Sequence, residues 1–140
     1  AKIGGKTVTK IGNYAFYECV GMKSVKLPDG LKEIGDYAFY FCTSLESIAV
    51  PDSVTTIGKG ACSSCTVLTS AKLPKNLGAI SEELFSCCWI LKDVNIPSGV
   101  KSIGGAAFYG CEKLADVTLS TKLKTHIAAP LPPSPFRIVL

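Results

Sequence analysis

Hydrophobic and polar positions along this chain repeat with a long period. The stretch IGDYAFYFCTSL at residues 34–45 has near copies elsewhere, which read IGNYAFYECVGM, IGKGACSSCTVL, ISEELFSCCWIL and IGGAAFYGCEKL. The isoleucines that open these copies, and the cysteines within them, recur with one constant 23-residue period. They are Ile11, Ile34, Ile57, Ile80 and Ile103, and Cys19, Cys42, Cys65, Cys88 and Cys111. A unit of this length cannot bury its own apolar face, so the repeat predicts a solenoid in which neighbouring coils share a core.

Two short strands are predicted within each coil. In LESIAVPDSV, an apolar segment ends at Pro51, which has no N–H to donate to a sheet. Stacked coils would align such segments as a parallel sheet, with neighbours about 4.8 Å apart. The equivalent segments run from Met22 to Leu27, from Leu45 to Val50, from Leu68 to Leu73, from Leu91 to Ile96 and from Leu114 to Leu119. The other side of the coil, SVTTIGKGA, predicts a second short strand and a tight turn in place of a helix.

Composition and charge narrow the functional classes. A chain of 140 residues that is 47% hydrophobic can bury a sizeable core as one domain. Its net charge is only +4, its charged residues are scattered over every coil, and its single arginine is Arg137. Nucleic-acid surfaces gather positive charge on one face and use arginine, so nucleic-acid binding is not expected. No window of about 18 apolar residues occurs, so membrane insertion is not expected either.

The repeated phrase V/L-x-x-I-G-x-x-A-F-x-x-C-x-x-L-x-x-[VI]-x-[LVI]-P resembles the 23-residue BspA-type leucine-rich repeats of bacterial and protist surface proteins. The resemblance covers residues 8–123. It implies a mainly β, right-handed leucine-rich-repeat solenoid of about five coils, with a parallel sheet on the concave face. It also implies adhesion or protein recognition within a longer, surface-located or secreted chain. It implies no catalytic residues and no cofactor.

The fourth coil departs most from this pattern. Cys62 stands in the column of Phe16, Phe39, Phe85 and Phe108, and one coil later Leu84 stands in the alanine column. An emptied phenylalanine site costs about 3–5 kcal/mol unless something refills it. Leu84 is therefore predicted to occupy the space that Cys62 leaves. Ser81 also replaces the glycine that follows each repeated isoleucine.

The seven cysteines invite a disulfide, metal or redox interpretation. Members of the cysteine column stack about 4.8 Å apart with parallel side chains, whereas a disulfide needs converging Cβ atoms about 3.8 Å apart. The column is therefore predicted to hold reduced, buried and unreactive thiols. The less favoured alternative is pairing or reactivity among Cys62, Cys87 and the column member Cys65. The lone histidine, His126, lies outside the column, so no metal site is expected.

No motif for nucleophilic catalysis or phosphate binding occurs, so an enzyme is not expected. Adjacent Glu82 and Glu83 would point to opposite faces of an extended chain and could not act as a pair. An oxidoreductase acting through Cys62 and Cys65 is the least favoured alternative. The leading hypothesis is a non-enzymatic module for protein interaction or adhesion. A structural spacer that presents other domains is the second hypothesis.

Two surfaces are predicted to bind a protein partner, such as a host or extracellular-matrix protein. The first is the concave strand face, with Ser24, Lys26, Ser47, Ala49, Ser70, Lys72, Asp93, Asn95, Asp116 and Thr118. The second is an aromatic ridge formed by Tyr14, Tyr17, Tyr37, Tyr40 and Phe41, because tyrosine is a common interface anchor. A merely solvated sheet, and tyrosines that only shield a turn, would look the same in the sequence.

The two ends of the chain differ from the coils. Residues 1–123 are predicted to form the solenoid, and residues 124–140 a proline-rich tail that serves as a linker, a cap or a cloning remnant. Its apolar end, residues 136–140, could fold back on the last coil. Gly4 and Gly5 stand where the next coil has Leu27 and Pro28. Such an incomplete end leads us to expect end-to-end self-association, or a tail tucked against one end.

Overall fold

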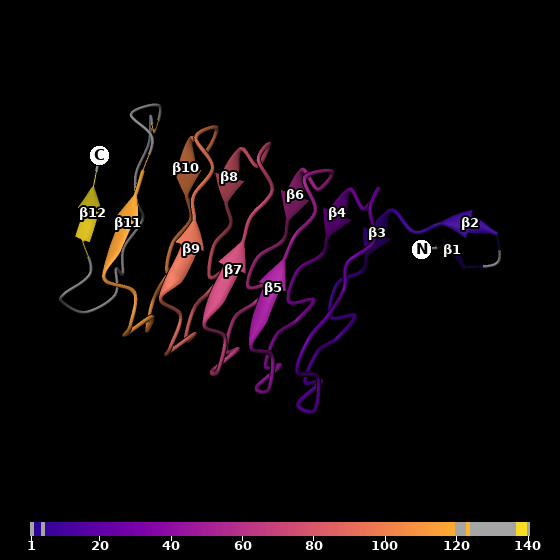
Figure 1. Cartoon of the computed structure of the whole chain (residues 1–140), viewed down its shortest axis with the longest axis horizontal. Coiled ribbons are helices and arrows are strands. Elements are labelled where there is room, and N and C mark those ends of the chain that lie inside the picture. The colour runs from indigo at the N-terminus through magenta and orange to yellow at the C-terminus, as the bar shows by residue number, and fades with distance from the viewer. Residues whose placement is uncertain (1, 4, 120–122, 124–136, 140) are drawn as a thin grey trace.

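The computed structural model describes residues 2, 3, 5–119, 123 and 137–139, and within them every regular element is a β-strand. The strands are short because each coil turns after two or three residues. The coils lie side by side along the long axis of the molecule (Figure 1). Among these residues there is no helix of the length and apolarity that crossing a membrane requires.

One side of the solenoid carries a three-stranded parallel sheet formed by β5 (Ser47–Ala49), β7 (Ser70–Lys72) and β9 (Asp93–Asn95). In its register Ser47 pairs with Ser70 and Ser70 with Asp93, so each residue pairs with its equivalent in the next coil. The next strand of this row is β11 (Asp116–Thr118). The register confirms that residues one repeat apart stack on one another.

The other side carries two-residue strands, again one from each coil. Here β3, β4 and β6 form one parallel sheet, and β8 and β10 form another. Ile11 pairs with Ile34, and Ile34 with Ile57. The strands are β3 (Lys10–Ile11), β4 (Glu33–Ile34), β6 (Thr56–Ile57), β8 (Ala79–Ile80) and β10 (Ser102–Ile103).

The core lies between the two rows of strands. In the second coil the predicted column residues Leu31, Ile34, Phe39 and Cys42 are almost wholly buried. Val25 in the same coil is only partly buried, but it packs against this core. The same columns are buried in the coils that follow, so one continuous apolar core runs along the stack. Mutual burial of the coils therefore stabilises the solenoid.

The gap between β6 and β8 has a local cause at Ser81. The amides of Gly35, Gly58 and Gly104 each donate to the isoleucine carbonyl of the preceding coil at 2.8 Å. At the equivalent position the Ser81 hydroxyl donates to the Ile57 carbonyl. Serine carries a Cβ that glycine lacks. At Gly35, Gly58 and Gly104 the preceding coil lies too close to leave room for such an atom. The described strands β6 and β8 accordingly fall in separate sheets.

The N-terminal end differs from the prediction of five coils, because the solenoid makes about four turns. β1 (Lys2–Ile3) and β2 (Lys6–Thr7) pair antiparallel and lie beyond β3, away from the stack (Figure 1). The expected strand between Met22 and Leu27 is not formed. The chain before it forms the antiparallel hairpin of β1 and β2, so the segment has no parallel neighbour on its N-terminal side.

At the opposite end, β12 (Arg137–Val139) pairs in parallel with β11. Asp116 pairs with Arg137, which is not the residue one full repeat ahead, so β12 does not continue the 23-residue repeat. This pairing is the arrangement that a tail folded onto the last coil requires. The division of the chain at residues 123 and 124 stays a prediction, and His126 lies outside the described residues.

Candidate functional site

The strand face bears an open hollow of about 520 Å³. Six of the residues predicted for this face line it, namely Ser47, Ala49, Ser70, Lys72, Asp93 and Asn95. Lys26 lines an adjoining hollow of about 330 Å³, which shares Ala49 and Lys72 with the first. Ser24 and Thr118 are exposed but line neither hollow, and the side chain of Asp116 lies outside the described part of the chain.

The chemistry of this face suits a polar partner. The lining of the hollow includes small serine and alanine side chains, and Lys72 and Asp93 contribute opposite charges. Asn95 is held in place by its neighbour's backbone, because its Oδ1 accepts from Leu73 N at 2.8 Å and its Nδ2 donates to Leu73 O at 3.3 Å. The face therefore presents the bonded amide of Asn95 beside the charged groups of Lys72 and Asp93.

The aromatic ridge is an ordered cluster of rings. Tyr14 stacks on Tyr37 with centroids 5.4 Å apart, and Tyr17 stacks on Tyr40 at 5.3 Å. Edge-to-face contacts join the two stacks at 5.8 Å and 5.7 Å. Phe41 extends the ridge beside Tyr40, at 6.0 Å. The stacking follows from the repeat, which places tyrosines at equivalent positions of neighbouring coils.

Three ridge residues, Tyr14, Tyr37 and Phe41, have left-handed backbone conformations with φ of 57°, 52° and 59°. Such conformations cost roughly 1–2 kcal/mol for a residue with a Cβ. The same two turn positions are left-handed in other coils, as at Ser64, Glu83, Cys87, Ala106 and Gly110. The strain therefore belongs to the turn that every coil makes, and is not a device specific to the ridge.

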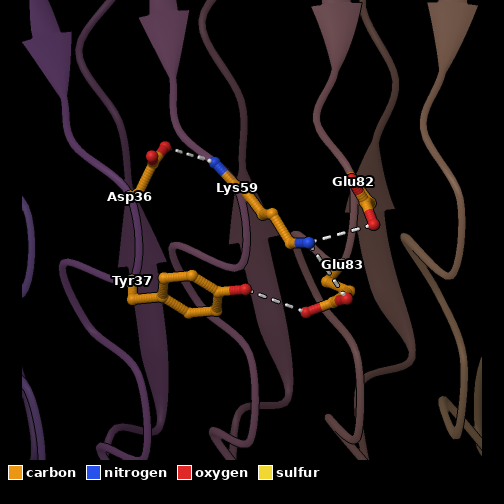
Figure 2. Close-up of polar contacts among 5 residues, drawn as sticks. All are labelled: Asp36, Tyr37, Lys59, Glu82 and Glu83. Carbon is orange, nitrogen blue, oxygen red and sulfur yellow. Dashed lines mark hydrogen bonds and ion pairs between the residues drawn. The ribbon is translucent and has the colours of Figure 1, made fainter.

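A polar cluster adjoins the ridge and holds one of its rings (Figure 2). Tyr37 OH donates to Glu83 Oε2 at 3.2 Å. Lys59 Nζ lies 3.0 Å from Glu82 Oε1 and 3.5 Å from Glu83 Oε1. Asp36 Oδ1 accepts from the backbone N of Lys59 at 2.8 Å. The cluster thus joins three neighbouring coils.

The expectation that Glu82 and Glu83 point to opposite faces is wrong, because both carboxylates reach the ammonium of Lys59. It assumed an extended chain, whereas Glu83 has a left-handed conformation with φ 57°. The cluster itself went unrecognised in the sequence. The signal was present in the column of Asn13, Asp36, Lys59 and Glu82, in which acidic and basic residues occupy equivalent positions of successive coils.

Two pKa values in the cluster follow from these contacts. The hydrogen bond to Glu82 is the largest cause that raises the pKa of Lys59, so its ammonium stays charged. The pKa of Tyr37 is also raised, first by burial and then by the negative charge of Glu83, which keeps the phenol protonated.

Gly60 clears the path of the Tyr37 ring toward Glu83. A Cβ added at Gly60 would meet the ring atoms Cδ1 and Cε1 of Tyr37, the first at 2.6 Å. Gly60 is buried and has a left-handed φ of 57°. A larger residue would therefore be strained and would displace the ring from its position over the coil.

The seven cysteines are free thiols, and five of them are buried. The thiols of Cys65 and Cys111 donate to carbonyls of the preceding coil, at 3.2 Å and 3.1 Å. Burial raises the pKa of Cys42 to about 11 and those of Cys65 and Cys111 to about 12. Burial also raises the pKa of Cys62 well above its usual value. These protonated thiols are poor nucleophiles.

We expect native-state labelling to separate the cysteines by burial. A pKa of about 11 in place of 9.0 leaves Cys42 with roughly 100-fold less thiolate below pH 9. Iodoacetamide at pH 8, followed by mass spectrometry, should modify the half-buried Cys19 and Cys87 first. Labelling in urea provides the control in which all seven react. Rapid native labelling of Cys42 or Cys111 would contradict a stable, closed core.

The chain is similar to known proteins over most of its length. The model of the BspA type leucine-rich repeat region matches residues 3–115 in 6 copies. A solved leucine-rich repeat protein of T. pallidum is 39% identical with a TM-score of 0.81, over 84% of this chain and 55% of that one. A leucine-rich cell surface protein of Faecalibacterium prausnitzii is 35% identical with a TM-score of 0.66, over 69% of this chain and 26% of that one.

A leucine-rich repeat protein of Bacteroides ovatus is also similar, with 26% identity and a TM-score of 0.71, over 99% of this chain and 41% of that one. No curated protein matches the chain. The chain thus spans about half, or less, of the length of these solved structures.

Proposed function

The chain belongs to the BspA-type leucine-rich repeat family, and we propose that it is a non-enzymatic protein-binding module of a surface or secreted protein. Leucine-rich repeat proteins commonly mediate protein interaction and are typically not enzymes. One solved relative is described as a cell surface protein, which supports the proposed location. Adhesion to a host or extracellular-matrix protein is the role we propose within that class.

The observation that carries this proposal is the open hollow of about 520 Å³ across β5, β7 and β9. Its lining combines small side chains with the charged groups of Lys72 and Asp93 and the amide of Asn95. A partner polypeptide can approach such a surface closely and find donors and acceptors for its own polar groups. A reactive centre would need converging titratable groups, and the buried, protonated Cys62 and Cys65 argue against a thiol enzyme.

Interferometry against a panel of purified extracellular-matrix and host-surface proteins tests this function. We expect Ser70→Arg, which fills the hollow on the strand face, to abolish binding of a protein that the unmodified chain captures. Thr56→Arg, on the exposed face of β6, is the matched control and should bind as before. Light scattering of the same samples separates partner binding from the end-to-end self-association that we also propose.

A spacer that presents other domains is the alternative function. If the chain is a spacer, it should bind no member of the panel. Replacing it by an unrelated solenoid of equal length should then leave the activity of the parent protein unchanged. Equal loss of binding in Ser70→Arg and Thr56→Arg would place the interface elsewhere than the strand face.

A further inference from the structure

Another open hollow, of about 350 Å³, lies on the aromatic ridge. It is lined by Tyr14, Tyr17, Tyr37, Tyr40 and Glu83. Tyr14 and Tyr17 are exposed over 54% and 44% of their surface, so their rings are accessible from solvent. Among the described residues that line this hollow, Glu83 is the one that carries a charge. The hollow therefore combines several π systems with a single carboxylate.

This combination favours a cation. The face of an aromatic ring carries negative potential and attracts guanidinium and ammonium groups within about 6 Å of the ring centroid. The carboxylate of Glu83 is oriented by the hydroxyl of Tyr37, which donates to its Oε2. Its Oε1 is 3.5 Å from Lys59, longer than a strong hydrogen bond, so it retains capacity to accept from a further donor.

The local charge points the same way. Asp36, Glu82 and Glu83 carry three negative charges, and the Lys59 ammonium in the same cluster carries one positive charge. These four residues together carry a formal charge of −2, on a chain whose net charge is +4. A cationic group is therefore attracted to this patch and not to the protein as a whole.

The protein already holds one cation beside the ridge. Lys59 reaches Glu82 and Glu83 from the neighbouring coil, with its ammonium close to the hydroxyl end of Tyr37 (Figure 2). A planar guanidinium suits the outer part of the hollow better than a second ammonium, because it stacks on aromatic faces and forks toward a carboxylate.

We propose that the four ridge tyrosines and Glu83 bind an arginine side chain presented by an extended segment of a protein partner. The inference rests on the proposed function, because it takes a protein as the class of partner. It adds the chemistry that this second surface recognises.

A labelled nonapeptide carrying one central arginine among glycines and serines tests the proposal, with citrulline, a neutral isostere, in the control peptide. We expect chemical-shift changes in the ridge residues on titration with the arginine peptide. The citrulline peptide should bind roughly 2- to 30-fold more weakly, the range expected of a cation–π contact. Because the chain is itself positively charged, non-specific attraction to a cationic peptide is disfavoured.

Variants locate the site. Tyr17→Ala and Glu83→Gln should each weaken arginine-peptide binding, while Tyr109→Ala should not, although Tyr109 is as exposed as Tyr17 and lies in the same column four coils on. Lys59→Gln should strengthen binding, because it frees Glu82 and Glu83 of their internal cation. If Lys59→Gln only destabilised the fold, binding would weaken. Stronger binding therefore reports on recognition, and weaker binding on loss of stability.

Equal binding of the arginine and citrulline peptides would overturn the proposal, as would the absence of any shift change at millimolar peptide. Response to a neutral oligosaccharide in place of the peptide would identify the ridge as a sugar platform and also overturn it. A protein captured through the strand face, with no arginine response at the ridge, refutes this inference alone and leaves the proposed function intact.

Discussion

Leu84→Ala is expected to destabilise the protein by about 2–5 kcal/mol, the range for removing a buried leucine side chain from a well-packed core. Leu84 is 1% exposed and Cys62 is 4% exposed, and both belong to the same apolar core. The amide of Cys62 donates to the carbonyl of Leu84 at 3.0 Å, so the two residues are direct neighbours in adjacent coils. Urea unfolding followed by circular dichroism measures the loss.

A double-mutant cycle tests whether Leu84 occupies the space left by Cys62. Cys62→Phe alone should cost about 1–3 kcal/mol, because it adds a ring to a filled site. Combined with Leu84→Ala it recreates the pattern of the other coils, and the pair should cost less than the sum of the single variants. Leu114→Ala is the control, since Leu114 is equally buried but two coils away, and its effect should add to that of Cys62→Phe. Additivity in both cycles would show that the two side chains share no space.

The register and the core follow from the repeat alone. An apolar column that recurs once in every repeat can be buried only if equivalent positions stack, and Ile34 does pair with Ile57. The repeat predicts only what neighbouring copies share. The prediction of strand pairing therefore fails where a copy lacks a regular neighbour or differs in sequence from the others. The unformed strand after Met22 is the first case. The separation of β6 from β8 at Ser81 is the second.

The candidate site could be predicted only in part. Stacked tyrosines follow from their spacing, since Tyr14 and Tyr37 occupy one column. The contacts of Glu83 could not be inferred in the same way, because they depend on a left-handed backbone that a non-glycine residue rarely adopts. The role of Gly60 could not be predicted either, because it depends on the Tyr37 ring lying across the neighbouring coil over this glycine. Whether either surface binds a partner depends on groups outside this chain.

Gly58→Ala is expected to destabilise the solenoid by about 1–3 kcal/mol, the usual cost of forcing an extra methyl group into a packed site. A Cβ at Gly58 would lie 2.5 Å from the backbone N of Asp36 and 2.6 Å from the carbonyl carbon of Gly35. Because both atoms belong to the backbone, no side-chain rotation can relieve the clash. The coils must separate, which strains the bond from Gly58 N to Ile34 O, now 2.8 Å long.

Gly12→Ala is the matched control for this prediction, because Gly12 occupies the same column and an added Cβ there meets nothing within 4 Å. Both variants restrict the unfolded chain equally, so the difference between their unfolding free energies isolates the clash.

Ser81 indicates how the chain would respond to a Cβ at Gly58. The Cβ of Ser81 is tolerated, but β6 and β8 do not pair. The Ser81 hydroxyl donates to the Ile57 carbonyl, which replaces the amide donor of the glycines in the other coils. Alanine has no hydroxyl to offer, so hydrogen exchange at the amide of the substituted residue, which bonds Ile34 O in the native chain, should accelerate in Gly58→Ala. Unchanged exchange and equal stability of the two variants would contradict the prediction, because they would mean that the added Cβ is accommodated without separating the coils.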